Sequence, residues 1–347
     1  MKLKRRYVRR PEHVTAIYSI GSSFLLISAL LACLGKNPIL AIYYMFSSNF
    51  SSPFAVSEIF VRASPLIFVS LGTLASFRAR FWNLAGDAQF YAGALLATMV
   101  GLTPVFKWIH PLACLTAGGV AGLLMGFFIA YLKVRFNADE VVTSLMLNFA
   151  AFYFLSLLLQ TVMRNPHTNW PESEYLLDSS LLPNLVRGTR FHLGIALAFL
   201  LLPLMDLILN RTVFGEEVTA IGINPKAAEI NKIDVRGHIL KIGALGGFLC
   251  GLGGAVEVLG VHHHLTATIS ANYGIFGVII STASRLSVYG AGALSVLLSL
   301  VINGATSLTR YMQIPSFISD IISALVLITA AIFTALEKYE VIVEWRR

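Results

Sequence analysis

Long apolar stretches, separated by short polar segments, recur from one end of the chain to the other. A straight membrane crossing needs about 20 residues, so the second, eighth and ninth of these stretches could be broken, tilted or re-entrant. The pattern predicts an all-α transmembrane bundle of about ten membrane segments, with no separate soluble domain in residues 1–347. The ten stretches are Ala16–Leu34, Pro65–Phe77, Gln89–Trp108, Pro111–Leu132, Val141–Val162, Leu193–Leu209, Ile242–Val261, Tyr273–Ser284, Ala291–Asn303 and Phe317–Leu336.

Composition and charge agree with this pattern. The chain is 56% hydrophobic and 13% charged, which is typical of a polytopic helical membrane protein. Ten crossings place both termini on one side, and 19 of the 26 Lys and Arg residues fall on that side. The positive-inside rule therefore predicts cytoplasmic termini. The net charge of +8 does not indicate nucleic acid, because the basic residues lie at span ends and in the N-terminal arm, residues 1–15, where they orient the chain and contact membrane lipid.

Two further features of the apolar segments concern processing and thiols. A basic arm before an apolar run also resembles a signal peptide, but Ala16–Leu34 is long enough to span, and we expect an uncleaved first helix. The three cysteines, Cys33, Cys114 and Cys250, lie in apolar segments. We expect free, buried thiols and neither a disulfide nor a metal framework.

The longest polar run between two apolar spans is Arg211–Lys241, and it carries five basic residues. The same charge rule places it in the cytoplasm. Within it, Asn224 as an N-cap, Pro225 at the first helical position and the helix formers that follow predict a short helix. A short capped helix could dock onto a soluble partner; the alternative is an ordinary solvated loop.

Polar side chains also occur inside or beside the apolar spans. Asn83 can cap the helix that follows it, and Asp87 suits the positive end of that helix, so these residues could form no more than a helix start. Asn148 lies about two turns into its span, where an amide either bonds a neighbouring helix or lines a pathway. Glu257 is an ionisable group in an apolar helix, and such groups are candidates for function.

Two local sequence patterns, a run of histidines and a regular spacing of glycines, do not require a chemical function. Three consecutive histidines, 262–264, could suggest a metal, but adjacent residues do not share a helix face and no second ligand cluster accompanies them; we expect a wet outer loop and no metal. Glycines recur every fourth residue at positions 118, 122 and 126 and at 243, 247 and 251. Such spacing lets helices approach closely, and we assign it a structural role only.

Four segments carry a resemblance to one family. GEEVTAIGINPKAAEINKI resembles the coupling-loop signature of ABC-importer permeases for nucleosides and simple sugars, within the ribose and branched-chain amino-acid permease group; that family usually has Gly where this chain has Lys232. FWNLAGDAQ resembles FNIGAEGQ, with Asp87 in place of Glu and Ala88 in place of Gly. ADEVVTSLMLN resembles the nucleoside-type NEVITTLMLN, with Ala138 in place of Asn. GAVEVLG, which holds Glu257, resembles GAIEVLG.

The resemblance implies a permease subunit that moves a nucleoside by alternating access. Its translocation pathway would include Asn83, Asp87, Gln89, Asn148 and Glu257. The loop would couple to an ATPase through Gly222, Asn224, Pro225, Ala227, Ala228, Glu229 and Ile233.

The resemblance also implies partners. They are an ABC ATPase that binds ATP and Mg, a second permease subunit forming a heterodimer, and an extracytoplasmic substrate-binding lipoprotein, all at a bacterial cytoplasmic membrane. This chain itself would bind no cofactor and would not be an enzyme, since it has no G-x-x-x-x-G-K-[ST] motif. The alternatives are a permease for a ribose-like sugar or a flavin, and an ion-coupled secondary transporter with Asp87 and Glu257 as the coupling carboxylates.

Overall fold

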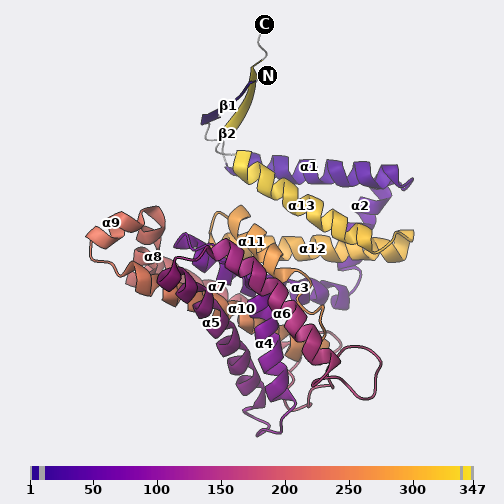
Figure 1. Ribbon diagram of the computed structural model, residues 1–347. Helices are drawn as coiled ribbons and strands as arrows, with labels where there is room; N and C mark the ends of the chain where they lie inside the picture. Colours follow the sequence, from indigo (N-terminus) through magenta and orange to yellow (C-terminus); the bar gives the residue numbers. More distant parts are fainter. Residues whose placement is uncertain (1, 8–11, 337–338, 345–347) are drawn as a thin grey trace. The chain divides into compact units, whose positions relative to one another are not determined.

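The computed structural model describes residues 2–7, 12–336 and 339–344, and these residues are mostly helical (Figure 1). The predicted all-α class is confirmed, and one short antiparallel pair of strands flanks the helices. In chain order the elements are β1 (Lys2–Tyr7), α1 (Glu12–Cys33), α2 (Pro38–Ser47), η1 (Ser48–Phe50), α3 (Pro53–Arg78), α4 (Gly86–Gly101), α5 (His110–Phe136), α6 (Glu140–Gln160), α7 (Leu193–Arg211), α8 (Val213–Ile223), α9 (Pro225–Ile230), α10 (Val235–Glu257), the π-helical turn η2 (Val258–His262), α11 (Tyr273–Ala283), α12 (Val288–Met312), α13 (Phe317–Leu336) and β2 (Tyr339–Glu344).

Six helices of the described residues are long and apolar enough to cross a membrane. They are α3, α5, α6, α7, α10 together with η2, and α12. A seventh span is possible if the bent pair 21–33 and 38–50, which turns by 120°, counts as one. The described part of the chain is therefore a multi-pass membrane protein with six or seven membrane-capable segments.

The lengths of three helices, α3, α4 and α12, differ from the sequence-based expectation. The second and ninth predicted stretches looked short, but α3 and α12 have 26 and 25 residues. Pro65 does not interrupt α3, which continues through it. The eighth stretch is indeed short, since α11 has 11 residues, and α4 has only 16 and ends at Gly101. Both α4 and α11 are thus too short for a straight crossing.

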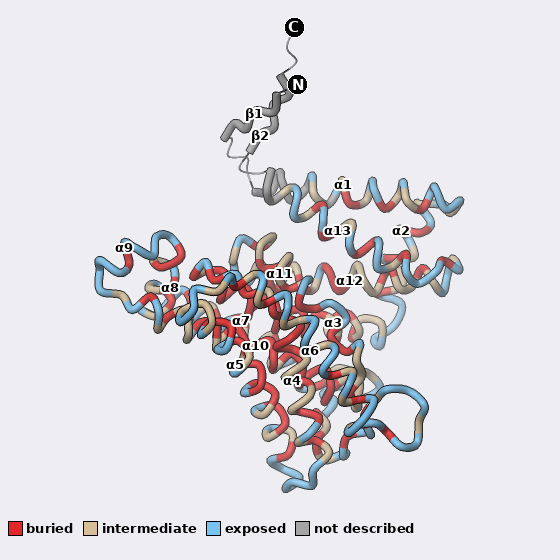
Figure 2. The backbone as a smooth tube through the Cα atoms, viewed as in Figure 1, coloured by how far each residue is buried: buried red, intermediate tan, exposed pale blue. Residues whose placement is uncertain are grey.

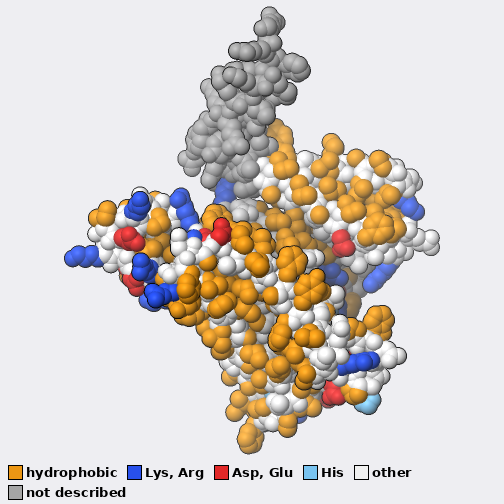
Figure 3. Space-filling model, in the orientation of Figure 1, with side chains coloured by type: hydrophobic (Ala, Val, Ile, Leu, Met, Phe, Trp, Pro, Cys, Tyr) orange, Lys and Arg blue, Asp and Glu red, His pale blue; other side chains and the backbone are white. Residues whose placement is uncertain are grey.

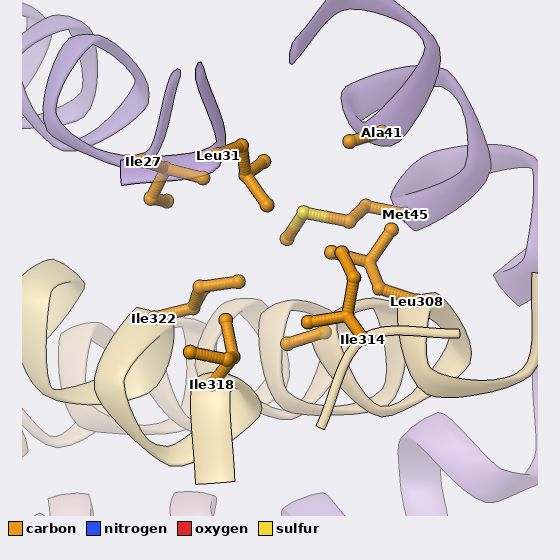
Figure 4. Packing of buried hydrophobic residues seen from close by; sticks show 9 residues of the cluster. Ile27, Leu31, Ala41, Met45, Leu308, Ile314, Ile318 and Ile322 are labelled. Carbon is orange, nitrogen blue, oxygen red and sulfur yellow. The ribbon is translucent and has the colours of Figure 1, made fainter. Parts of the chain in front are cut away.

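The chain divides into two compact units, and residues 1–59 with 297–347 form the first. Its core lies between α1, α2, α12 and α13 and includes Ile27, Leu31, Met45, Leu308 and Ile322 (Figure 4). Within the arm, residues 1–15, the described strand β1 pairs antiparallel with β2, and α1 begins at Glu12. Cys33 is exposed, contrary to the prediction, because the last turn of α1 presents it away from this core.

Residues 60–296 form the second unit, and α10 is its central helix (Figure 2). The apolar window of α10 is 78% buried, whereas that of α6 is 11% buried, so α6 lies at the surface of the unit. The close helix approach that this glycine spacing allows is found between α5 and α10. A Cβ on Gly122 would lie 2.2 Å from the carbonyl oxygen of Gly247, and one on Gly126 would lie 2.2 Å from that of Gly243.

Candidate functional site

Two short helices of the second unit begin beside the middle of α3. A Cβ on Gly86, the first residue of α4, would lie 3.2 Å from the Val69 side chain, and one on Gly277 of α11 would lie 2.6 Å from it. Val69 is nine residues before Arg78, the end of α3, which corresponds to about 13 Å of helix. Residues 79–85 therefore turn back along α3 before α4 begins. Half-helices that start inside a membrane protein often mark the binding site of a transporter.

Asp87 holds the starts of these two helices together. It is in the first turn of α4, and its Oδ1 accepts hydrogen bonds from the backbone N–H of Gly274 at 2.8 Å and from the Ser270 hydroxyl. Asp87 is 8% exposed. Because helix N-termini carry partial positive charge, one carboxylate here compensates two of them. Ser270 is a residue that the sequence reasoning missed, since nothing in the pattern links it to Asp87.

Three amide side chains complete the same cluster. Asn148 of α6 donates to the Leu84 carbonyl at 2.9 Å and accepts from the Ala88 N–H at 2.9 Å. Asn83 accepts from the Ala85 N–H at 3.1 Å and from the Gln89 side chain at 3.2 Å. Four of the five predicted pathway residues are thus brought together. Every one of them bonds another part of the chain, so this cluster fixes the segment that leads into α4.

Glu257, the fifth predicted residue, has a different environment. It ends α10, is 4% exposed and is followed by η2. Its Oε1 lies 3.4 Å from Nε2 of His262, while its Oε2 has no hydrogen-bond partner. Tyr273 of α11, next to the Gly274 that Asp87 bonds, lies within hydrogen-bonding range of the Glu257 carboxylate, so the unpartnered atom of that carboxylate is Oε2 alone. Tyr273 was also missed by the sequence reasoning.

Among the described residues, no group of three or more His, Cys, Asp or Glu side chains is placed to hold a metal ion. His264 lies 3.6 Å from Glu172, in the loop between α6 and α7. His192, which precedes α7, is fully buried. Burial and the nearby His263 and Arg190 lower the pKa of His192 to about 4, and burial lowers the pKa of His263. Both imidazoles are therefore neutral at pH 7.

The short helix predicted within Arg211–Lys241 is confirmed as α9. The Asn224 side chain caps it by accepting from the N–H groups of Lys226 and Ala227 at 3.1 and 3.3 Å. Its exit is at Lys232, whose φ of 62° is the left-handed conformation that glycine favours. The exit thus keeps the backbone geometry expected of a glycine, with a lysine in that place.

The seven predicted coupling residues divide into buried and exposed sets. Ala228 is 3% exposed and packs with Ile221 and Val235, with Ile233 beside them. Gly222 contacts the backbone of Arg78, since a Cβ there would overlap its carbonyl oxygen. The exposed set is Asn224, Pro225, Ala227 and Glu229. Ile223 and Ile230, which the sequence reasoning did not single out, are 71% and 82% exposed, and Lys and Arg side chains gather around α8 and α9 (Figure 3).

Comparison with known proteins identifies the class. Residues 55–331 match the family described as "Branched-chain amino acid transport system / permease component", and the chain belongs to this family.

The curated relatives include three that cover most of the chain. The glucose ABC transporter permease protein TsgB13 of Haloferax volcanii is 27% identical, over 90% of this chain and 85% of that protein. The guanosine ABC transporter permease protein NupP of Bacillus subtilis is 27% identical, over 83% and 84%. The nucleoside ABC transporter permease protein NupB of Lactococcus lactis is 24% identical, over 91% and 90%.

These findings confirm the resemblance stated from the sequence. The relatives are permease components of ABC transporters, which are transport subunits and not enzymes. An importer permease of this family implies an ATPase partner and a substrate-binding protein. The substrates that the relatives' names give include nucleosides and sugars.

Proposed function

We propose that this chain is a permease subunit that moves a nucleoside across a bacterial cytoplasmic membrane, driven by ATP and Mg on a partner ATPase. The observation that carries the ATPase coupling is the preformed α8–α9 element, in which Asn224 caps α9 and Ala228 anchors it, so that Ile230 stands exposed beside basic residues. The nucleoside is supported by the names of two relatives that cover 83% and 91% of this chain. A sugar is the second candidate, since a glucose permease covers 90% of it.

The proposal includes the assembly. The chain would pair with a second, different permease and receive its solute from an extracytoplasmic lipoprotein. Both termini would lie in the cytoplasm, with about ten membrane segments if α1, α4, α11 and α13 enter the bilayer besides the six long helices. The pairing of β1 with β2 supports termini on one side, and it requires an even number of crossings between them. Asn83, Asp87, Gln89, Asn148 and Glu257 would border the translocation pathway, the first four by holding its half-helices.

Uptake of labelled guanosine and labelled glucose, in cells with and without the gene, tests the substrate. Loss of guanosine uptake alone supports the proposal, and loss of glucose uptake alone assigns a sugar. Purified chain reconstituted alone in liposomes should move neither solute. Gradient-driven transport by the lone chain would instead make it an ion-coupled secondary transporter.

The coupling element has its own test. Ile230→Glu and Ala227→Glu place a charge on the exposed face of α9 and should uncouple ATP hydrolysis from uptake while the complex still inserts in the membrane. Val213→Glu is the matched control, because Val213 is also exposed, at 70%, but begins α8. Ala228→Glu should instead lower the amount of folded protein, since Ala228 is buried. Normal coupled transport by the α9 variants would contradict the proposal.

A further inference from the structure

Buried polar atoms without a partner are concentrated around one turn of the chain. Eight buried side-chain nitrogen or oxygen atoms of the described residues have no hydrogen-bond partner. Four of them belong to three residues that flank or contact η2: Oε2 of Glu257, both ring nitrogens of His192, and Nδ1 of His263. Buried polar groups are normally hydrogen-bonded, and each exception calls for an explanation. Such exceptions are expected at functional sites.

These groups are held in place and do not result from a loose loop. The N–H of His263 bonds the Val258 carbonyl at 2.8 Å and closes η2. Two backbone bonds then tie the turn to the outer loop, from Leu182 N–H to the Leu259 carbonyl at 3.1 Å and from Leu176 N–H to the His263 carbonyl at 2.9 Å.

The π-helical turn itself selects which side chains meet. In an α-helix, the side chains of residues i and i+5 point in different directions. In the wider π-helical turn, residue i+5 lies close to residue i. His262, five residues after Glu257, accordingly lies over its carboxylate at 3.4 Å. On another part of the turn, Gly260 leaves room for the buried His192 ring, since a Cβ there would lie 2.6 Å from Nδ1 of His192.

The hydrogen-bonding capacity of these unpartnered atoms indicates which kind of ligand could bind them. A neutral imidazole offers one donor and one acceptor, and a carboxylate offers acceptors only. Hydroxyl groups both donate and accept, so they can pair with all of these atoms. The low pKa of His192, about 4, and the lowered pKa of His263 keep both rings neutral, which suits an uncharged ligand. The side chain of His262 is 40% exposed and that of Glu257 only 5%, so His262 stands between solvent and the carboxylate.

We propose that η2 and its flanking residues form a solute-binding station at the outer end of α10, where Glu257, His192 and His263 hydrogen-bond an uncharged, hydroxyl-bearing solute in transit and His262 covers the carboxylate between turnovers. This inference rests on the proposed transport function and adds the chemical class that the permease itself recognises.

The first experiment compares two buried histidines in the complete importer. His192 and His110 are both fully buried, but the ring nitrogens of His110 are bonded to Ser179 Oγ at 2.8 Å and to the Val100 carbonyl at 3.0 Å. His110→Leu removes satisfied bonds and should lower the melting temperature of the complex. His192→Leu removes unpaired nitrogens, so it should leave the melting temperature unchanged or raise it, while uptake of guanosine at subsaturating concentration falls about tenfold or more. Normal uptake by His192→Leu would overturn the inference.

The second experiment tests the hydroxyl groups. Glu257→Gln preserves size and removes the charge, so wild type and variant are compared for uptake of guanosine and of 2′,3′-dideoxyguanosine through the same receptor. We expect the preference for guanosine over its dideoxy analogue to shrink about tenfold in the variant. An unchanged preference would mean that Glu257 does not contact the hydroxyl groups and would overturn the assignment.

The two proposals fail in different ways. If the wild-type importer takes up no guanosine, the nucleoside function is refuted, and the melting temperatures still decide the inference. A loss of stability in His192→Leu equal to that in His110→Leu would show that the ring of His192 is bonded internally, or to a fixed water only, and would overturn it. An unchanged or higher melting temperature would support it.

Discussion

The glycine contact between α5 and α10 allows a quantitative prediction for Gly122→Ala. The new methyl group would lie 2.2 Å from the Gly247 carbonyl oxygen and 2.7 Å from the Gly251 Cα, whereas ordinary van der Waals contact begins near 3.4 Å. Both obstacles are backbone atoms, so no side chain can rotate away and the helices must separate by about 1 Å. Overpacking of this kind costs about 1–3 kcal/mol, and we expect the upper end of that range.

The matched control is Gly21→Ala in α1, where a new Cβ has nothing within 4 Å. Alanine is the better helix former, so this variant should be neutral or more stable by up to about 1 kcal/mol. Both variants and the wild type would be purified in one detergent and heated while the monodisperse fraction is followed by fluorescence-detected size exclusion. We expect Gly122→Ala to melt several degrees below Gly21→Ala. Equal melting temperatures would refute the argument that direct backbone contact joins the two helices.

Two further predictions concern the candidate site. Asn148→Ala leaves the Leu84 carbonyl and the Ala88 N–H without their partner, which should cost about 3 kcal/mol and show as a lower midpoint in thermal unfolding; an unchanged midpoint would mean that Asn148 does not hold the start of α4. For His192, the folded pKa of about 4 lies below the ordinary 6.5, so the unfolded chain binds the extra proton between those values. Stability should therefore fall by about 3 kcal/mol as the pH drops from 6.5 to 4, and the unfolding midpoints of His192→Leu should depend correspondingly less on pH.

Hydrophobicity predicted most helices because an apolar helix in a membrane must be long and nearly uncharged. The boundaries were less predictable where polar residues are buried by protein. Pro65 marked a false start for α3, whose first half contains Glu58 and Arg62 and reads as a loop. In the opposite direction, Leu102–Trp108 is apolar enough to extend α4, but the helix ends at Gly101.

The candidate site was predictable as a set of residues but not as an arrangement. The motif around Asn83 and Asp87 marked a helix start, which the structure contains. That Asp87 also caps α11 depends on Ser270 and Gly274, nearly two hundred residues later, and no local pattern encodes that contact. His192 was overlooked because a single histidine before a span carries no sequence signal. His192 is of interest because its ring is buried and has no hydrogen-bond partner, and only the three-dimensional structure shows this.

The interlocked glycines also determine how movement can pass through the second unit. Backbone atoms touch backbone atoms at successive turns of α5 and α10, so neither helix can slide along the other without collision. The pair is then a stiff strut of about 33 Å along α10, from Val235, which packs against Ala228 beneath α9, to Glu257 at the π-helical turn. In the transport function proposed above, a movement of the loop 211–241 would reach the other end of α10 as a tilt of both helices together. One rigid displacement could then carry the effect of ATP hydrolysis to the residues around η2.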